Sequence, residues 1–294
     1  MILAFDIGGT RIRAAMAEGG RLTPLGECPT PTGTFRDFAE ALRGFVRPEV
    51  SGIALSIAGV VDAATGRITV ANIPCLHGRP LARDLGAALN LPVLVLNDAD
   101  CFALAEAKAG AGRGHENSFA IILGTGGGGG LILNRRLVQG AGGFAGEWGH
   151  GPVIRDPALQ CGCGQVGCLD TVGGARGMER LHFWRTGETF AVEEILRRWR
   201  AGEGATVALW LKLVAGVLAV VLNTVGVSVV PVGGGLGNDH GLVAALDAAL
   251  RARILRRTEG PLVVPAQIST DAGLVGAAAA GEAAFGQDSA GDLR

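Results

Sequence analysis

The sequence predicts an α/β fold, because segments typical of buried strands alternate with segments typical of helices along most of the chain. Residues 35–47 (FRDFAEALRGFVR) carry apolar side chains at helical spacing. Residues 91–98 (LPVLVLND) form an apolar run typical of a parallel strand covered on both faces. Glycine-rich turns follow several strand-like runs. In open α/β sheets binding and chemistry gather where strands end, so these turns are where function is expected.

Residues 2–18 (ILAFDIGGTRIRAAMAE) predict two strands joined by a glycine turn. Small glycines beside a hydroxyl and a cation let backbone N–H groups approach an anion closely. The residues of this turn are Asp6, Gly8, Gly9, Thr10 and Arg11. Most glycine hairpins are only turns, however, so this turn alone does not establish phosphate binding.

A strand is expected over residues 51–62 (SGIALSIAGVVD), a helix over residues 79–90 (RPLARDLGAALN), and a second helix over residues 99–110. Asp98 stands between the strand at residues 91–98 and that second helix. A carboxylate there could cap the helix, or it could face a cleft as a catalytic base. The residues alone leave both roles open.

Residues 118–138 (SFAIILGTGGGGGLILNRRLV) repeat the first pattern, with a buried strand, a glycine turn around Thr125 and a returning apolar strand. The turn is not a Walker A loop, because no Gly-Lys-Ser/Thr follows and the glycines open a hairpin rather than a helix. The five glycines from Gly126 to Gly130 cost backbone entropy that a purely structural turn would not require. Two such turns could hold the two ends of a polyphosphate.

The segment from Gly146 to Asp170 (GEWGHGPVIRDPALQCGCGQVGCLD) contains a histidine and three cysteines, which are donors that tetrahedral Zn²⁺ prefers. These residues are His150, Cys161, Cys163 and Cys168. Four protein ligands leave no open position, so the metal would be structural and would fix the carboxylates of Glu147 and Asp170. The alternative is three unrelated buried thiols, because free cysteine is often a small apolar core residue.

Residues 213–232 carry no formal charge over twenty positions, which is long enough by hydropathy to span a bilayer. Asn223, Thr224 and Gly226 interrupt this run, so we expect a buried helix, a turn and a buried strand instead. That strand leads into a glycine loop formed by Gly233, Gly234 and Gly235. A further strand (residues 261–269, PLVVPAQIS) and an alanine-rich terminal helix are expected after it.

The length of 294 residues allows two domains that share a cleft. We expect them at residues 1–108 and 109–270, with a terminal helix at about residues 271–286 packing back on the first domain.

The net charge of −1 is spread along the chain and gives no electrostatic footprint for nucleic acid. The apolar N-terminal run is stopped by Asp6 and is too short for a signal peptide. Three cysteines are scattered and three are clustered, which differs from the disulfide framework of a secreted protein. We therefore expect reduced thiols and a cytoplasmic protein.

Five segments resemble the ROK family of sugar kinases: DIGGTRIR, LNDADCFALAEA, LGTGGGGGLI, GFAGEWGH and CGCGQVGCLD. They occur in the family's order and span residues 4–282, nearly the whole chain. The combination of GExGH followed by CxCGxxGC is highly specific to the family. Within it, ANIPCLHGRPLARDL leading into NDADCFALAEA looks most like bacterial N-acetylglucosamine kinases.

The resemblance implies an α/β, actin/hexokinase-like (ribonuclease H-like) two-domain fold in which ATP and sugar meet in an interdomain cleft. It implies an ATP:hexose 6-phosphotransferase that uses N-acetyl-D-glucosamine, with N-acetylmannosamine or glucose as alternatives. Asp98 would take the proton of the sugar 6-hydroxyl. The residues implied to bind the sugar are Gly59, Asn72, Asn97, Asp98, Glu147, His150 and Asp170.

The resemblance also implies the cofactor sites, with the two glycine turns on the phosphates of ATP and the later glycine loop on the adenosine. The ATP-binding residues would be Asp6, Gly8, Gly9, Thr10, Arg11, Thr125, Gly126, Gly127, Gly233, Gly234 and Gly235. Mg²⁺ would bridge the phosphates, held by Asp6 through water. The histidine and three cysteines match the family's zinc ligands. The resemblance suggests a homodimer, for which the apolar helices after residue 204 could supply an interface.

Several positions depart from the family pattern. Arg11 replaces the usual lysine, which keeps the charge but changes a point donor to a planar fork. Asp170 replaces the usual glutamate and is one methylene shorter. Ala58 and Thr224 stand where the family commonly has prolines. None of these changes removes the base or a metal ligand.

Two other classes compete with a kinase. ROK repressors carry a helix-turn-helix ahead of the first glycine turn, whereas the strand here starts at residue 2. A zinc-ribbon interaction module is disfavoured by a cluster of only three thiols inside a chain without a basic stripe. The hexose itself is left undecided, because the candidate sugars differ at one substituent or one stereocentre.

Overall fold

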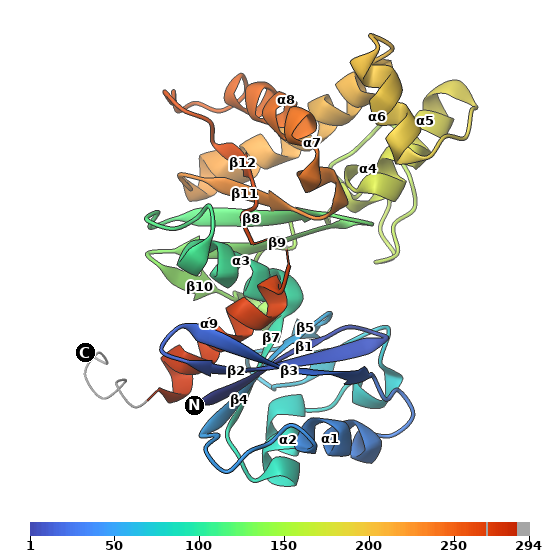
Figure 1. The fold of residues 1–294 in the computed structure, drawn as a ribbon. Helices are drawn as coiled ribbons and strands as arrows, with labels where there is room; N and C mark the ends of the chain where they lie inside the picture. Colours follow the sequence, from blue (N-terminus) through green and yellow to red (C-terminus); the bar gives the residue numbers. More distant parts are fainter. Residues whose placement is uncertain (269, 287–294) are drawn as a thin grey trace. The chain divides into compact units, whose positions relative to one another are not determined.

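In the computed structural model, which describes residues 1–268 and 270–286, the chain forms two compact units (Figure 1). Unit 1 contains residues 1–110, 137–145 and the C-terminal segment from residue 268, and unit 2 contains residues 111–136 and 146–267. Each unit combines a five-stranded sheet with helices, so the predicted α/β class is confirmed.

The sheet of unit 1 has the strand order β3-β2-β1-β4-β7. β1 (Ile2–Ile7), β2 (Arg11–Glu18) and β3 (Arg21–Pro29) form an antiparallel meander. β4 (Gly52–Ile57) and β7 (Val93–Asn97) run parallel to β1, so the C-terminal ends of all three strands lie at one edge. The strand expected over residues 51–62 is interrupted at Ala58 and Gly59, after which β5 (Val60–Val61) pairs with β6 (Ile68–Thr69).

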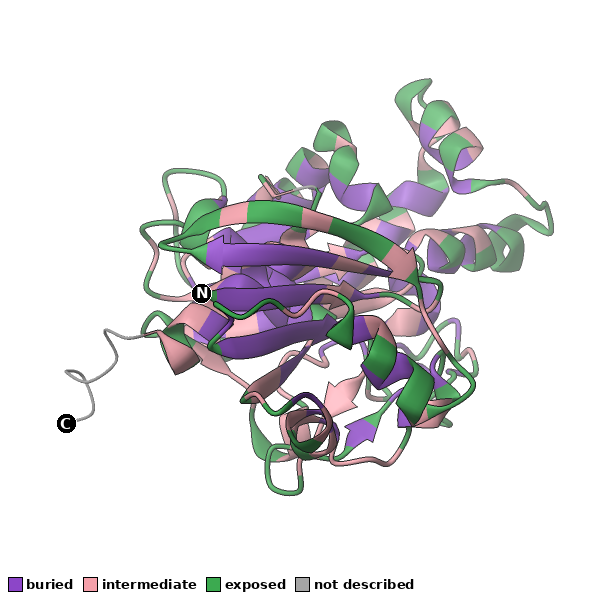
Figure 2. Ribbon diagram, turned by 60° about the horizontal axis from the view of Figure 1, so that its bottom comes forward, coloured by how far each residue is buried: buried purple, intermediate pink, exposed green. Residues whose placement is uncertain are grey.

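Helices cover both faces of this sheet. Alternate residues of β1 point to opposite faces, where α1 (Phe35–Arg43) and α2 (Leu81–Leu89) pack on one side and α3 (Asp98–Ala109) and α9 (Ala272–Phe285) on the other. The strands beside the N-terminus are accordingly coloured as buried in Figure 2. α1 begins after Thr34, whose side chain accepts the Asp37 N–H, and is followed by Gly44, so it is shorter than the expected 35–47.

The sheet of unit 2 has the equivalent order, β10-β9-β8-β11-β12. β8 (Ser118–Leu123) and β9 (Gly127–Leu133) form its hairpin, β10 (Arg136–Val138) its edge, and β11 (Val230–Gly233) and β12 (Val263–Pro265) its parallel strands. The strand expected over residues 261–269 is therefore confined to three residues; its last residue, Ser269, lies outside the described part of the chain.

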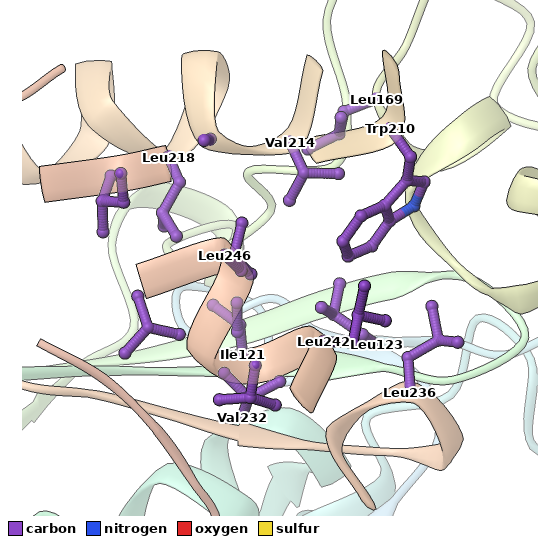
Figure 3. Packing of buried hydrophobic residues seen from close by; sticks show 14 of the residues in the cluster. Ile121, Leu123, Leu169, Trp210, Val214, Leu218, Val232, Leu236, Leu242 and Leu246 are labelled. Carbon is purple, nitrogen blue, oxygen red and sulfur yellow. The ribbon is translucent and has the colours of Figure 1, made fainter. Parts of the chain in front are cut away.

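Five helices accompany the second sheet: α4 (Asp170–Gly173), α5 (Ala175–Thr186), α6 (Val192–Arg200), α7 (Ala205–Val225) and α8 (His240–Arg251). Short 3₁₀ turns occur at Pro74–Leu76, Ala141–Gly143 and Gly235–Asn238. Within residues 1–268 and 270–286, α7 is the one helix long and apolar enough to cross a bilayer by length and composition. Its residues Trp210, Val214 and Leu218 are fully buried in the core of unit 2 (Figure 3), which accounts for that composition.

Candidate active site

The turn between β1 and β2, Asp6–Arg11, is closed by a hydrogen bond from Gly8 N to Arg11 O at 2.9 Å. Gly9 lies against Asn72, since a Cβ added at Gly9 would stand 3.0 Å from the Asn72 Cβ. The structure therefore brings one expected sugar residue beside one expected phosphate residue. Arg11, expected on the phosphates, is held by the Glu27 carboxylate, with Nη1 3.0 Å from both carboxylate oxygens.

Asp6 at the end of β1 forms an ion pair with Arg13, whose Nη2 lies 2.6 Å from Asp6 Oδ2. Arg13 also contacts Asp271. The hydrogen bond to Asp6 raises the pKa of Arg13 above its ordinary value. Sequence reasoning missed Arg13, although the hairpin register pairs it directly with Asp6 and would have revealed the contact.

Asn97 and Asp98 stand at the end of β7, where that strand passes directly into α3. Asn97 is the N-cap: its Oδ1 accepts from Ala99 N at 2.7 Å, and its Nδ2 donates to Gly59 O at 3.0 Å. Asp98 is exposed, and its Oδ1 accepts from Ala99 N at 2.9 Å. Because Asn97 is the N-cap of α3, the capping role considered for Asp98 belongs to its neighbour. Asn97 thus joins Gly59 and Asp98 in one group.

The turn between β8 and β9, Leu123–Gly127, is covered from one side by α4 and α5. Gly127 N donates to Asp170 Oδ1 at 2.8 Å, and Ala175 N donates to Gly124 O at 2.8 Å. A Cβ at Gly126 would stand 2.5 Å from Asp170 Oδ1. Asp170, expected to contact the sugar, is therefore bound through its carboxylate to the β8–β9 turn, which is expected to bind phosphate.

The glycine run that follows has packing reasons that the sequence did not reveal. A Cβ at Gly129 would stand 2.9 Å from the Phe119 ring, and the Gly129 carbonyl lies close to Gly146, which has a φ of +91°. Trp148 donates from Nε1 to Gly128 O at 3.0 Å. The segment that carries Glu147 and His150 is thus seated directly on the glycine strand, where side chains would hold it away.

The predicted zinc ligands converge. The ligand atoms of His150, Cys161, Cys163 and Cys168 all lie within 4.8 Å of one another. Cys163 Sγ is 3.6 Å from Cys168 Sγ, and Cys161 Sγ is 3.7 Å from His150 Nδ1. Ligands at about 2.3 Å from a tetrahedral zinc are about 3.8 Å from one another, so the observed spacing fits the ion.

Glu147 lies on the other side of the His150 ring, with its Oε2 3.7 Å from His150 Nε2. The pKa of Glu147 is raised above its ordinary value, chiefly because the carboxyl is partly buried, and the nearby charge of Asp170 raises it further. Since Nδ1 faces the thiols and Nε2 faces Glu147, the imidazole can serve the metal with one nitrogen and orient a carboxylate with the other.

The loop after β11 lines a hollow of about 570 Å³ together with the start of α5 and with α6 and α8. Among its lining residues are Ala175, Leu196, Gly235, Leu236 and His240. Gly234 has a φ of +82°, and a Cβ there would stand 2.6 Å from the backbone of Leu123. The loop expected to bind adenosine therefore packs against the β8–β9 turn.

A model of the ROK family matches residues 2–283. The N-acetyl-D-glucosamine kinase of Pasteurella multocida is 34% identical over 299 aligned positions, which cover 95% of this chain and 98% of that protein. A ROK hexokinase structure from Thermus thermophilus has 32% identity and a TM-score of 0.83, covering 95% of this chain and 96% of that one. A ROK family glucokinase from Streptomyces griseus, solved with glucose and AMPPNP, has 29% identity and a TM-score of 0.73, covering 94% and 97%.

Proposed function

The chain belongs to the ROK family and is a sugar kinase, and we propose that it phosphorylates the 6-hydroxyl of N-acetyl-D-glucosamine with ATP, giving N-acetylglucosamine 6-phosphate. The observation that carries this proposal is the exposed carboxylate of Asp98 at the carboxyl end of β7. Polar residues at the ends of parallel strands are where α/β proteins bind small molecules.

Asp98 accepts the proton of the sugar 6-hydroxyl. At the same time the hydroxyl oxygen of the sugar bonds to the γ-phosphorus, and the bond from that phosphorus to the leaving oxygen of ADP breaks. Phosphoryl transfer through a loose transition state requires alignment and charge stabilisation more than covalent chemistry. A carboxylate base contributes about 10²–10⁴ in rate, and alignment of the two substrates about 7–11 kcal/mol.

Polar side chains and backbone groups are proposed to bind the sugar hydroxyls. The residues proposed for this are Gly59, Asn72, Asn97, Glu147, His150 and Asp170. The contacts within unit 1 support the first three, since Asn97 bonds to Gly59 and Asn72 lies beside Gly9. Carboxylates accept hydrogen bonds from sugar hydroxyls and so hold the ring in one orientation.

ATP is bound through both glycine turns, Asp6–Arg11 and Leu123–Gly127, with the adenosine in the hollow beside Gly235. Mg²⁺ would neutralise phosphate charge when bound, and Asp6 would hold it through water. Asp6 is also paired with Arg13, whose Nη2 lies 2.6 Å from Asp6 Oδ2.

A structural Zn²⁺ is proposed at His150, Cys161, Cys163 and Cys168, supported by their mutual distances and by the chemistry of the donor set. When bound, the ion fixes the loop that carries Glu147 and Asp170.

We also propose a cytoplasmic homodimer. The free cysteines agree with a reducing compartment, and Val220 on α7, 67% exposed, is an apolar surface position for the dimer contact. Sedimentation analysis of wild type and Val220→Lys tests it.

The Asp98→Asn variant tests the mechanism. We expect kcat to fall by about 10²–10⁴ while the dissociation constant for sugar, measured by calorimetry, stays within about twofold. Asp37→Asn, which removes an exposed carboxylate from α1, is the control. Wild-type turnover by Asp98→Asn would exclude this residue as the base.

Sugar identity is tested by kcat/KM for N-acetylglucosamine, N-acetylmannosamine and glucose in an ATP-coupled assay. We expect the highest value for N-acetylglucosamine. A higher value for either other sugar would replace the proposed substrate with that sugar. Binding of a sugar without phosphorylation of any would favour a sugar-sensing regulator.

A further inference from the structure

A hollow of about 390 Å³ opens in unit 2 beside the β8–β9 turn. Thr125 and Gly126 of the turn line it, together with Asp170, Arg176 and Arg180. The two arginines lie one helical turn apart on α5, so their side chains leave the helix on the same face. The hollow therefore combines the phosphate turn with two cations.

The charges of these arginines are not consumed by neighbouring acids. Within the described residues, neither arginine forms an ion pair closer than 4.0 Å. Among the residues that the structure describes, Arg180 donates from Nε alone, to Thr171 O at 2.9 Å. This bond positions the side chain and leaves its terminal nitrogens for a ligand. Asp170 also lines the hollow, but its Oδ1 already accepts from Gly127 N.

The position of Arg176 disfavours a purely structural role. It is the second residue of α5, where the helix dipole favours acids over cations, and the first turn of α5 contains no acid. Arg176 is exposed and lines the hollow. An anion bound in the hollow would interact favourably with both this cation and the N-terminus of α5.

The two hollows of unit 2 flank the same first turn of α5. Ala175 lines the hollow beside Gly235, and Arg176, the next residue, lines the hollow beside Thr125. Gly234 also packs on the backbone of Leu123 and Gly124, which joins the two loops. A nucleotide can thus place its base in one hollow and its phosphates in the other.

We propose that Arg176 and Arg180 bind the phosphate chain of the phosphoryl donor in this hollow. The inference rests on the proposed function and extends it by two residues. The guanidinium forks donate to non-bridging phosphate oxygens, alongside the Thr125 hydroxyl and the backbone N–H groups of the turn. Charge on the transferring group is thereby stabilised without a covalent step.

The test compares Arg176→Gln, Arg180→Gln and the two lysine variants with wild type. We expect each glutamine variant to raise KM for ATP and the dissociation constant for inorganic tripolyphosphate, measured by calorimetry, by about tenfold. The dissociation constant for sugar should stay unchanged, and lysine should restore part of the loss because it keeps the charge without the fork. Arg83→Gln, which removes an exposed charge from α2 in unit 1, is the control.

Tripolyphosphate binding separates this inference from the proposed function. If wild type phosphorylates no sugar but its tripolyphosphate binding still depends on both arginines, the proposed function fails and the anion site stands. Wild-type tripolyphosphate affinity in folded glutamine variants would overturn the inference, as would an equal loss in Arg83→Gln or a rise confined to KM for sugar. Circular dichroism and the lysine variants identify a variant that is merely misfolded.

Discussion

The sheets of the two units have equivalent strand orders, but the turns between their first two strands differ in charge. In each sheet a hairpin is followed by two parallel strands, so the turns Asp6–Arg11 and Leu123–Gly127 occupy equivalent positions. The unit 1 turn carries its own charges, which are paired with Arg13 and Glu27. The unit 2 turn has no charged side chain and receives Asp170 from α4. Turns at equivalent positions can therefore obtain charged groups either from their own side chains or from a neighbouring segment.

The two units are also braced by different means. In unit 2 the segment from Gly146 to Asp170 lies on the glycine strand and carries the cluster of thiols and histidine. In unit 1 the corresponding tightness comes from helix packing, because a Cβ at Gly276 of α9 would stand 1.8 Å from the Cys101 carbonyl oxygen of α3. The proposed metal would stabilise unit 2, whereas a close contact between two helices stabilises unit 1. Substitutions that remove each of these features separate the two contributions.

Removal of a zinc ligand has the largest expected effect on this comparison. In Cys163→Ser we expect loss of the bound metal and a decrease of about 3–5 kcal/mol in the free energy of unfolding of unit 2, with a weaker affinity for sugar. Mass spectrometry for metals and scanning calorimetry measure both. Cys28→Ser in unit 1 is the matched control. A zinc-free wild type, prepared without chelator, would rule out the metal.

Filling the helix contact of unit 1 has the next largest effect. Gly276→Ala is expected to destabilise unit 1 by about 3 kcal/mol, because the backbone of α3 must move to admit the methyl group. Gly216→Ala in α7 meets no atom within 4 Å and is expected to stabilise its helix by about 0.5–1 kcal/mol. Chemical denaturation of both variants checks the opposite signs. Equal effects would show that α3 and α9 are not a tight contact.

The threonines of the two turns test whether both turns hold phosphate. Thr10→Val and Thr125→Val each remove one hydroxyl at an exposed position, and each should raise KM for ATP by about tenfold with little change in sugar affinity. Steady-state kinetics of both variants and of the double variant provide the measurement. Thr23→Val, on the exposed strand β3, is the control. If only Thr125→Val responds, the likeness between the turns ends at the backbone.

Motifs tied to backbone shape were predictable, whereas contacts between distant segments were not. The α/β class follows from strand-like runs and glycine turns, and the family from short motifs such as GExGH followed by CxCGxxGC, all of which are local in the sequence. The helix–turn–strand interpretation of residues 213–232 is confirmed by α7 and β11. No local pattern shows that Asp170 reaches Gly127, or that Arg176 and Arg180 line the same hollow. Such pairs depend on how α4 and α5 pack on the sheet.

The smallest expected effect concerns the charge that unit 1 keeps within its own turn. Glu27 holds Arg11 in an exposed ion pair, which is worth less than about 1 kcal/mol and is weakened by salt. Glu27→Gln should release the Arg11 guanidinium toward a phosphate and lower KM for ATP by about twofold at low ionic strength. The change should vanish at about 1 M salt, where charges are screened within about 3 Å. Glu40→Gln, which breaks an exposed pair with Arg43 on α1, should leave KM unchanged. A higher KM in Glu27→Gln would mean that Glu27 positions Arg11 for the phosphate instead of withholding it, so the sign of this small shift decides which of the two the ion pair does.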